Sequence, residues 1–249
     1  MIGDALSLVL LFGAGLVAGA LNVVAGGGSF LTLPLLIFLG LPPGLANGTN
    51  RVGILCQNIG AVWSFRRHGL FDRRALVWAA LPATLGAILG AWLALQIEDR
   101  AFQKILAGLM VAVALWTFLA PRPKLTEDPS SLRISPFLVA GFFAAGVYGG
   151  FVQAGVGFFI LTLLAMAGLD MVRGNAVKVM TILCFTVLSL GVFAWQGQVH
   201  WVWGLILASG TSLGGLIGVR LTVLRGEAWV RKVVLVMVIV FAIRLWWTA

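Results

Sequence analysis

Acidic residues are scarce in this chain of 249 residues, which carries eight Asp and Glu against 17 Lys and Arg. Charged residues of all kinds make up only 10% of the sequence, whereas hydrophobic residues make up 61%. A soluble domain of average composition has about 25% charged residues, and no water-soluble fold has an interior large enough to bury so much apolar surface. The sequence therefore predicts an integral membrane protein.

Charges are also absent from several long stretches. None lies in 5–50, 75–97 or 134–169, and none in 179–219 when His200 is neutral. A helix needs about 20 apolar residues to cross a bilayer. These stretches predict a multi-pass protein whose main partner is the lipid bilayer.

Motifs that carry catalysis are missing as well. The chain has no Walker loop, nucleophile elbow or HExxH sequence, and His68 and His200 both fall in expected loops. Its two cysteines, Cys56 and Cys184, each lie in an apolar stretch with no Cys or His at ligand spacing. We therefore expect no enzyme activity, cofactor, metal site or disulfide, and we interpret the thiols as buried and inert.

The basic residues lie in short loops between the apolar stretches. A net charge of +9 would suit a nucleic-acid-binding protein only if Lys and Arg clustered on a folded surface with interleaved aromatic residues. Basic loops in a membrane protein are instead topology signals. The first four residues contain no Lys or Arg, so we expect the first apolar segment to be retained rather than cleaved as a signal peptide.

The two halves of the chain resemble each other at an offset of about 127 residues. The matched pairs keep their order along the chain, with a one-residue slip at the cysteines: Gly15 with Gly141, Arg51 with Lys178, Cys56 with Cys184, Gly86 with Gly214, and Gly90 with Gly218. Internal symmetry of this kind is typical of transporters. We divide the chain into an N-terminal repeat (1–121), a polar cytoplasmic linker (122–134) and a C-terminal repeat (135–249).

Each repeat begins with an apolar segment that is broken by glycine, 5–40 in the first and 135–169 in the second. The arm Ser29 to Leu39 would rise only ~16 Å as a helix, about half of the ~30 Å hydrocarbon core, so these segments are expected to be re-entrant hairpins. Three ordinary spans follow in each repeat, near 47–65, 75–96 and 102–120, and near 174–195, 201–224 and 229–248. The predicted fold is an all-α membrane protein of two inverted-topology repeats, each a hairpin plus three transmembrane helices.

Loop charges predict the orientation. The loop 66–74 is basic and its counterpart 196–200 has no Lys or Arg, whereas 97–100 contains Glu98 and Asp99 and its counterpart 225–232 is basic. Under the positive-inside rule this exchange indicates that the repeats have opposite orientations. We expect 66–74 and the linker on the cytoplasmic side of the inner (plasma) membrane.

Polar residues that remain inside the apolar stretches are cationic or neutral, and ionisable residues at such depth are by default a hypothesis of function. Asp and Glu lie only at expected span ends and in loops, so we expect no buried carboxylate relay. Cations, amides, hydroxyls and backbone N–H groups without carboxylates suit an anion. We predict a small-anion site formed by Asn22, Gly26, Gly27, Gly28, Ser29, Asn50, Arg51, Gln57, Gln153, Gly155, Gly157, Asn175 and Lys178.

The glycine runs have two interpretations. Glycine lets a backbone turn and approach a ligand closely, and a helix that restarts after a break offers unpaired N–H groups and a positive dipole end. Glycines also permit close helix packing, which we favour for Gly86, Gly90, Gly214 and Gly218. For Arg51 and Lys178, a pair of anion attractors competes with side chains that snorkel to the headgroups.

The motif GxxAGxxNxxAGGGSFLTLPLLIFLGLPPxxANGTNRV, the RHGLFD loop and the LGAxLGAWL run occur in this order, with a divergent second copy in which GGFVQA at 149–154 replaces GGGS. The sequence resembles the TauE/SafE family of sulfite and organosulfonate exporters over nearly its whole length. The resemblance implies export of a small sulfur oxyanion such as sulfite by alternating access. From the residues alone, a carrier or channel for another small anion such as a carboxylate, a non-transporting scaffold, and association as a homodimer all stay open.

Overall fold

The computed structural model describes residues 5–25, 27–67, 69–119, 134–225 and 239–247. Within these ranges every regular element is a helix. The helices, in chain order, are α1 (Ala5–Ala25), α2 (Ser29–Phe38), α3 (Pro43–Arg67), α4 (Arg73–Leu95), α5 (Asp99–Leu119), α6 (Pro136–Phe151), α7 (Val156–Met166), α8 (Met171–Trp195) and α9 (Trp201–Arg225). A further helical stretch covers 239–247. The prediction of an all-helical protein is confirmed for this part of the chain.

Among the described residues, four helical segments are long and apolar enough to cross a membrane: Ala5–Val23, Arg73–Leu95, Val172–Trp195 and Trp201–Gly218. Helix α3 is also long, with 25 residues, which corresponds to ~38 Å of helix. It is not among the four because Asn50, Arg51 and Gln57 make it polar, and all three are buried. A polar helix in this setting has to be enclosed by the other helices.

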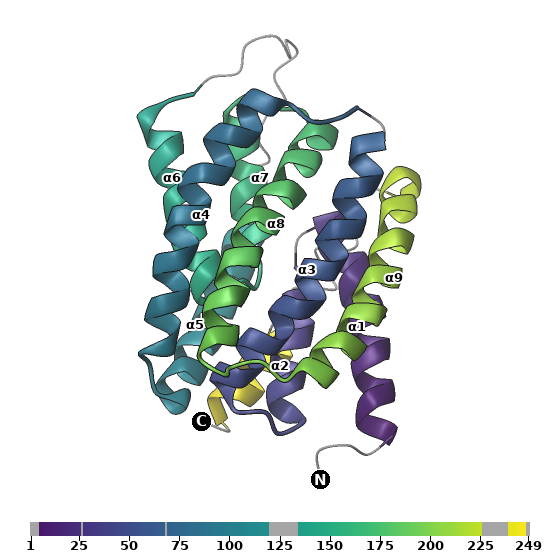
Figure 1. The fold of residues 1–249 in the computed structure, drawn as a ribbon, viewed down its shortest axis with the longest axis vertical. Coiled ribbons are helices and arrows are strands. Elements are labelled where there is room, and N and C mark those ends of the chain that lie inside the picture. Colours follow the sequence, from purple (N-terminus) through teal and green to yellow (C-terminus); the bar gives the residue numbers. More distant parts are fainter. Residues whose placement is uncertain (1–4, 26, 68, 120–133, 226–238, 248–249) are drawn as a thin grey trace.

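The two short helices α2 and α7 each follow a break in the chain. In Figure 1, the turn between α1 and α2 lies inside the bundle, and the outer ends of both helices lie at the lower end of the view. The turn between α6 and α7 also lies inside the bundle, but the outer ends of those helices lie at the upper end. In both glycine-broken segments, 5–40 and 135–169, the described residues therefore contain a turn between helices, which includes 27–28 in the first and 152–155 in the second.

The largest contacts between helices are made by α1 with α9 and by α4 with α6, followed by α3 with α9 and α4 with α8. Glycines line the first two interfaces. A Cβ at Gly214 would overlap the backbone of Leu16 in α1, and a Cβ at Gly90 would overlap the backbone of Val147 in α6. Gly86 and Gly218 also lie against backbone, of Phe143 in α6 and of Ala20 in α1, and the approach at Gly218 is the longer of the two. The packing interpretation of these four glycines is confirmed.

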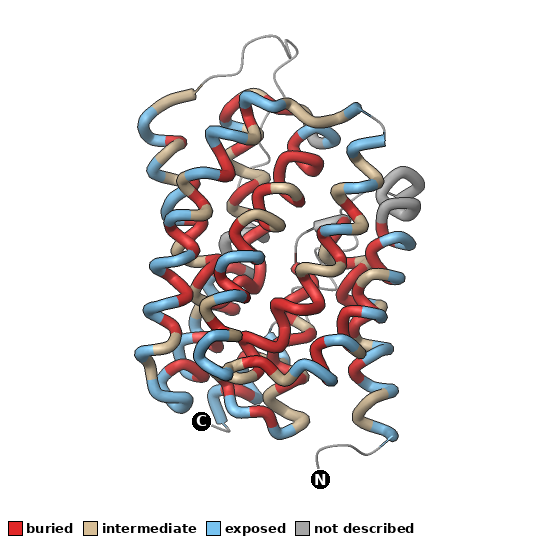
Figure 2. The backbone as a smooth tube through the Cα atoms, in the orientation of Figure 1, coloured by how far each residue is buried: buried red, intermediate tan, exposed pale blue. Residues whose placement is uncertain are grey.

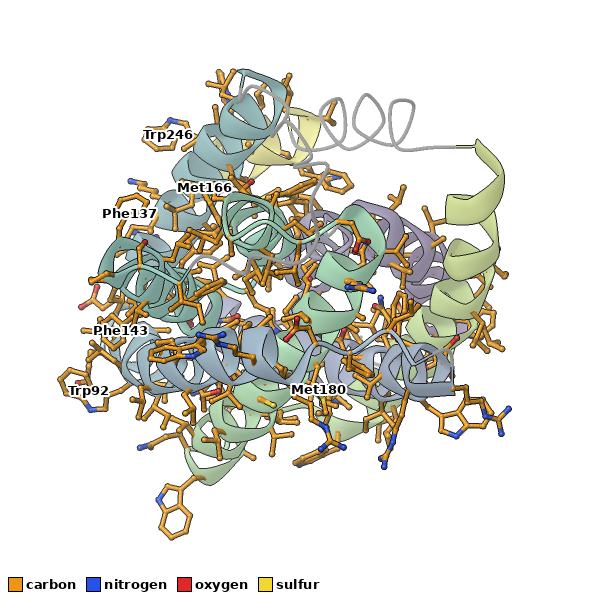
Figure 3. All side chains as sticks on the ribbon, turned by 90° about the horizontal axis from the view of Figure 1, so that it is seen from above. Trp92, Phe137, Phe143, Met166, Met180 and Trp246 are labelled. Atoms are coloured by element: carbon orange, nitrogen blue, oxygen red, sulfur yellow. The ribbon has the colours of Figure 1, made fainter. Side chains whose placement is uncertain are left out.

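Buried residues gather along α3 and α8, which lie in the middle of the bundle in Figure 2. The outside is apolar too. Figure 3 shows Trp92, Phe137 and Phe143 at the periphery of the bundle, where their exposed fractions are 54%, 68% and 40%. Large apolar side chains on the outside of a polar centre are the arrangement that a bilayer requires.

Candidate functional site

The turn before α2 places glycine where no side chain fits. Gly28 stands before the first residue of α2, and a Cβ there would overlap the backbone oxygen of Ala18 and lie 2.7 Å from Cβ of Asn22. The turn is closed by the amide of Phe30, which donates to the oxygen of Gly27 over 3.1 Å. Gly27, Gly28 and Ser29 are buried. Gly26, which the sequence also predicts for the site, lies outside the described residues.

The turn before α7 has two residues in the left-handed region. Gln153 has φ +66° and Gly155 has φ +75°. Gly155 has no Cβ and adopts this conformation easily, whereas it is uncommon for a residue such as Gln153. The side chain of Gln153 is fixed by two hydrogen bonds. Its Nε2 donates to Oγ1 of Thr186 in α8 over 2.6 Å, and its Oε1 accepts from Arg51 over 3.1 Å. Gly157 follows in the first turn of α7 and is buried.

The beginnings of the two short helices meet in the interior. A Cβ at Gly155 would overlap the ring of Phe30, which lies in the first turn of α2 and is fully buried. Neither α2 nor α7 has a side-chain cap at its start. The longer helices α4, α6 and α8 begin with Asp72, Ser135 and Asp170, whose side chains accept from first-turn amides. The ring of Phe30 therefore brings the starts of α2 and α7 into contact within the protein, and neither start has a side-chain cap.

Asn50 lies beside the first turn of α2. Its Oδ1 accepts from the hydroxyl of Thr32 over 2.6 Å, and the residue is 1% exposed. The Nδ2 of the same amide is buried without a hydrogen-bond partner among the described residues, as is the hydroxyl of Thr181 in α8. An unsatisfied buried donor is costly, and such groups in a native protein suggest a missing ligand or water.

Arg51 is fully buried, with 0% of its surface exposed. Its Nη1 donates to the Gly149 oxygen over 3.2 Å, to Gln153 and to the hydroxyl of Ser189 over 2.9 Å. Its Nη2 donates to the Gly150 oxygen and to Oδ1 of Asn47 over 3.5 Å. This burial contradicts the snorkelling alternative for Arg51.

Lys178 is also buried, with 1% of its surface exposed. Its Nζ donates to Oδ1 of Asn175 over 2.7 Å, so two residues predicted for the site are in contact. This burial contradicts the snorkelling alternative for Lys178 as well.

Asn22 and Gln57 form a third contact among the predicted residues. Nδ2 of Asn22 donates to Oε1 of Gln57 over 3.2 Å, and Nε2 of Gln57 donates to the Gly19 oxygen over 3.4 Å. Because Asn22 also touches the turn at Gly28, this pair links α3 to the break between α1 and α2.

Carboxylates in the described residues lie at helix ends. Asp72 and Asp170 cap α4 and α8, and Oδ1 of Asp99 accepts from the amide of Gly44 in the first turn of α3 over 2.9 Å. Glu98 is exposed. The described residues contain no group of three or more His, Cys, Asp or Glu that would hold a metal ion. Within them, the polar interior thus consists of cations, amides, hydroxyls and backbone groups.

The comparison with protein families decides the broad identity. The model of the family described as "Sulfite exporter TauE/SafE" matches residues 11–245. The chain belongs to this family. It is therefore a membrane transporter and not an enzyme.

Curated relatives agree with this membership. A "Probable membrane transporter protein ORF9" from Sinorhizobium sp. is 31% identical over 96% of this chain and 92% of its own length. A "Probable membrane transporter protein" from Haemophilus influenzae is 30% identical over 92% of this chain and 91% of its own. YfcA of Escherichia coli K12, with the same description, is 26% identical over 96% and 90%. No solved structure matches the chain.

The sequence analysis missed four of the residues that surround the candidate site of this TauE/SafE member: Asn47, Thr32, Thr186 and Ser189. Asn47 precedes Arg51 by one helical turn, so its position on the same helix face was a usable signal. Thr186 and Ser189 lie in the stretch 182–195, which is otherwise apolar. They are a weaker signal because a hydroxyl can bond to its own helix.

Proposed function

We propose that the protein is a secondary transporter that exports a small sulfur oxyanion, sulfite or an organosulfonate, across the inner membrane by alternating access. The observation that carries this proposal is the meeting of two uncapped helix N-termini, at Phe30 and Gly155, in the buried interior. We place the anion between these two turns.

The chemistry of the two turns favours an anion. The turns stand at the positive dipole ends of α2 and α7. The amides of Phe30 and Phe158 donate to the turn carbonyls of Gly27 and Gly155, so the helix dipole rather than these amides supplies the attraction. Half-helices that point their N-termini at an anionic group near the midplane are a recurring transporter device. The unpaired Nδ2 of Asn50 adds a side-chain donor beside the first turn of α2. In a low-dielectric interior these interactions are several-fold stronger than in water.

Two further observations support an anion over a cation. A cation site needs carboxylates or several converging carbonyl groups, and the carboxylates in the described ranges lie at helix ends. Arg51 and Lys178 add positive charge to the buried region. We place Lys178 and the amides of Asn22, Gln57 and Asn175 around the proposed site rather than in contact with the anion. Their side chains form hydrogen bonds with each other, Asn22 with Gln57 and Lys178 with Asn175.

The packing of the helices supports two inverted repeats. Under the expected correspondence, α1 matches α6, α3 matches α8, and α4 matches α9. The contact of α1 with α9 then corresponds to that of α6 with α4, and the contact of α3 with α9 to that of α8 with α4. The two hairpins also open toward opposite ends of the bundle (Figure 1). Alternating access would arise from motion of one half against the other around the shared site.

The two buried cations fit this scheme. Arg51 lies eight residues after the start of α3 at Pro43, and Lys178 lies seven residues after the start of α8 at Met171. At 1.5 Å per residue they lie ~12 Å and ~10 Å from those helix starts, which are at opposite ends of the bundle (Figure 1). We propose that each raises the potential for an anion that approaches from its own side of the membrane.

The family supports the choice of substrate through its description as sulfite exporters. The names of the relatives describe membrane transporters and specify no substrate. Flux of radiolabelled sulfite into proteoliposomes tests the proposal. We expect flux that saturates and that is accelerated by sulfite or methanesulfonate on the opposite side.

A matched pair of variants on α3 locates the site. We expect Asn50→Leu to weaken the apparent sulfite affinity about tenfold, or ~1.4 kcal/mol, because it removes the unpaired donor. Asn58→Leu is the control, since Nδ2 of Asn58 donates to its own helix at the Ile54 oxygen. Flux that never saturates would indicate a channel. Absence of flux for every small anion would contradict a transporter of this class and favour a scaffold.

A further inference from the structure

Helix α6 ends inside the protein, where water is not available for its last carbonyl groups. Side chains of α3 replace water there. Arg51 donates to the oxygens of Gly149 and Gly150, and Nδ2 of Asn47 donates to the oxygen of Phe151 over 2.7 Å. Since the C-terminal end of a helix is the negative end of its dipole, a buried cation at this place is stabilising.

The same guanidinium also holds the turn that leads into α7. Arg51 donates to the side chain of Gln153, whose backbone is left-handed, and to Ser189 of α8, while the guanidinium carbon lies 4.6 Å from the ring centre of Phe193. One side chain thereby connects α3, the end of α6, the turn and α8. A change in its position would move the turn and with it the start of α7.

The hydrogen bonds of Arg51 leave little capacity for a ligand. The four N–H groups on Nη1 and Nη2 face five acceptors, and Nε is the one guanidinium nitrogen without an acceptor among the described residues. A guanidinium that binds an oxyanion in the usual way uses two N–H groups in a fork. Arg51 is committed to protein acceptors instead.

The negative end of α6 and the positive end of α7 are separated along the chain only by 152–155. Their fields therefore oppose each other at the turn, and an anion near α7 would also be repelled by the end of α6. A cation bonded to the carbonyls of α6 cancels that repulsion. The field at the turn is then that of the positive end of α7, which attracts an anion.

We propose that Arg51 is a positioning residue: its guanidinium neutralises the C-terminal end of α6 and fixes the Gln153 turn, so that α7 presents its N-terminus to the anion. This inference rests on the proposed function only for the anion itself. The placement of the turn by Arg51 is independent of any substrate.

The first test measures that placement without substrate, by hydrogen exchange of 149–157 in purified protein. We expect Arg51→Gln to accelerate amide exchange there at least tenfold and Arg51→Lys to have a smaller effect. Arg66→Gln, an equal loss of charge at an exposed site on the same helix, is the control and should leave exchange unchanged. Unaltered exchange in Arg51→Gln would overturn the inference.

The second test measures anion affinity in the same proteins. We expect Arg51→Gln to weaken sulfite binding at least tenfold, with partial rescue by Arg51→Lys. At alkaline pH, where sulfite is a dianion, the loss should exceed that for the monoanion methanesulfonate, because the uncancelled end of α6 repels a dianion more. Equal losses for the two anions would contradict the neutralising role.

A third measurement separates a positioning residue from a direct ligand. Gln153→Ala disturbs the turn that Arg51 holds, so its effect on sulfite affinity and that of Arg51→Gln should be non-additive in the double variant. Additive losses would assign Arg51 to the anion itself. If Arg51→Gln does not fold, Ser189→Ala replaces it in the exchange experiment, because this variant removes one acceptor of Nη1. Faster amide exchange of 149–157 would then support the positioning role, and unaltered exchange would contradict it. If the wild type binds no anion but exchange responds as expected, the proposed function fails and the positioning role stands.

Discussion

At the scale of single residues, small side chains set how closely the helices approach. Gly19 of α1 lies against α9, where a Cβ would overlap the backbone oxygen of Thr211. Gly210 and Gly214 of α9 make reciprocal approaches to the backbone of α1 at Phe12 and Leu16. Because backbone atoms cannot rotate away as a side chain can, an added methyl group has to push the two helices apart.

This contact predicts different outcomes for two glycines on α1. We expect Gly19→Ala to destabilise the protein by about 1–3 kcal/mol, the usual range for overpacking. Gly13 is exposed, and a Cβ there would meet nothing within 4 Å, so Gly13→Ala should stay within about 0.5 kcal/mol of the wild type. Thermal unfolding in one detergent compares the two. Equal stability of both variants would contradict the packing that we describe.

The roles of single residues could be predicted from the sequence where their spacing along a helix shows which face they share. The small residues at Gly86, Gly90, Gly214 and Gly218 have the spacing of a packing face, and they pack as expected. Two of the five acceptors of Arg51 could not be foreseen, because they are backbone carbonyls at the end of α6. Any residue type supplies a carbonyl, so the sequence holds no sign of them.

At the scale of elements, the helix positions were predictable to within a few residues. Helices α4 and α8 end at Leu95 and Trp195, against predicted ends at 96 and 195. The starts were less accurate: α3 was expected near 47 and begins at Pro43, and α8 was expected near 174 and begins at Met171. Proline is favoured in a first turn, and Asp170 caps α8, so part of this signal was available.

The loops between the helices fall into two sets, one at each end of the bundle. The α3–α4 and α7–α8 connections lie at one end of the bundle, and the α4–α5 and α8–α9 connections lie at the other (Figure 1). Arg66, Arg67, Arg73 and Arg74 all belong to the first end. The positive-inside rule therefore predicts that this end faces the cytoplasm.

Cysteine labelling tests the orientation in a variant with Cys56 and Cys184 replaced by serine. A membrane-impermeant maleimide added to the periplasmic side should modify Glu98→Cys and Gln196→Cys, both at exposed positions. Arg66→Cys and Arg74→Cys, equally exposed, should react only after the membrane is opened. Modification of either from the periplasmic side of sealed membranes would reverse the orientation.

At the scale of the whole molecule, the proposed site belongs to both halves of the chain. Phe30 and Asn50 come from the first half, whereas Gly155 comes from the second. The sequence identified the two glycine turns and the polar residues of α3 and α8. It did not reveal that the turns touch at Phe30 and Gly155, because that contact depends on how the halves pack.

The central claim, that an anion binds between the starts of α2 and α7, is tested most directly with selenite, the heavier analogue of sulfite. Its selenium can be located by anomalous scattering in crystals of the protein. The account predicts a peak beside the first turns of α2 and α7, with a selenite oxygen about 3 Å from Nδ2 of Asn50. That peak should disappear in Asn50→Leu and persist in Asn58→Leu. Selenite bound only at exposed arginines, with none beside Asn50 and the starts of α2 and α7, would contradict the account.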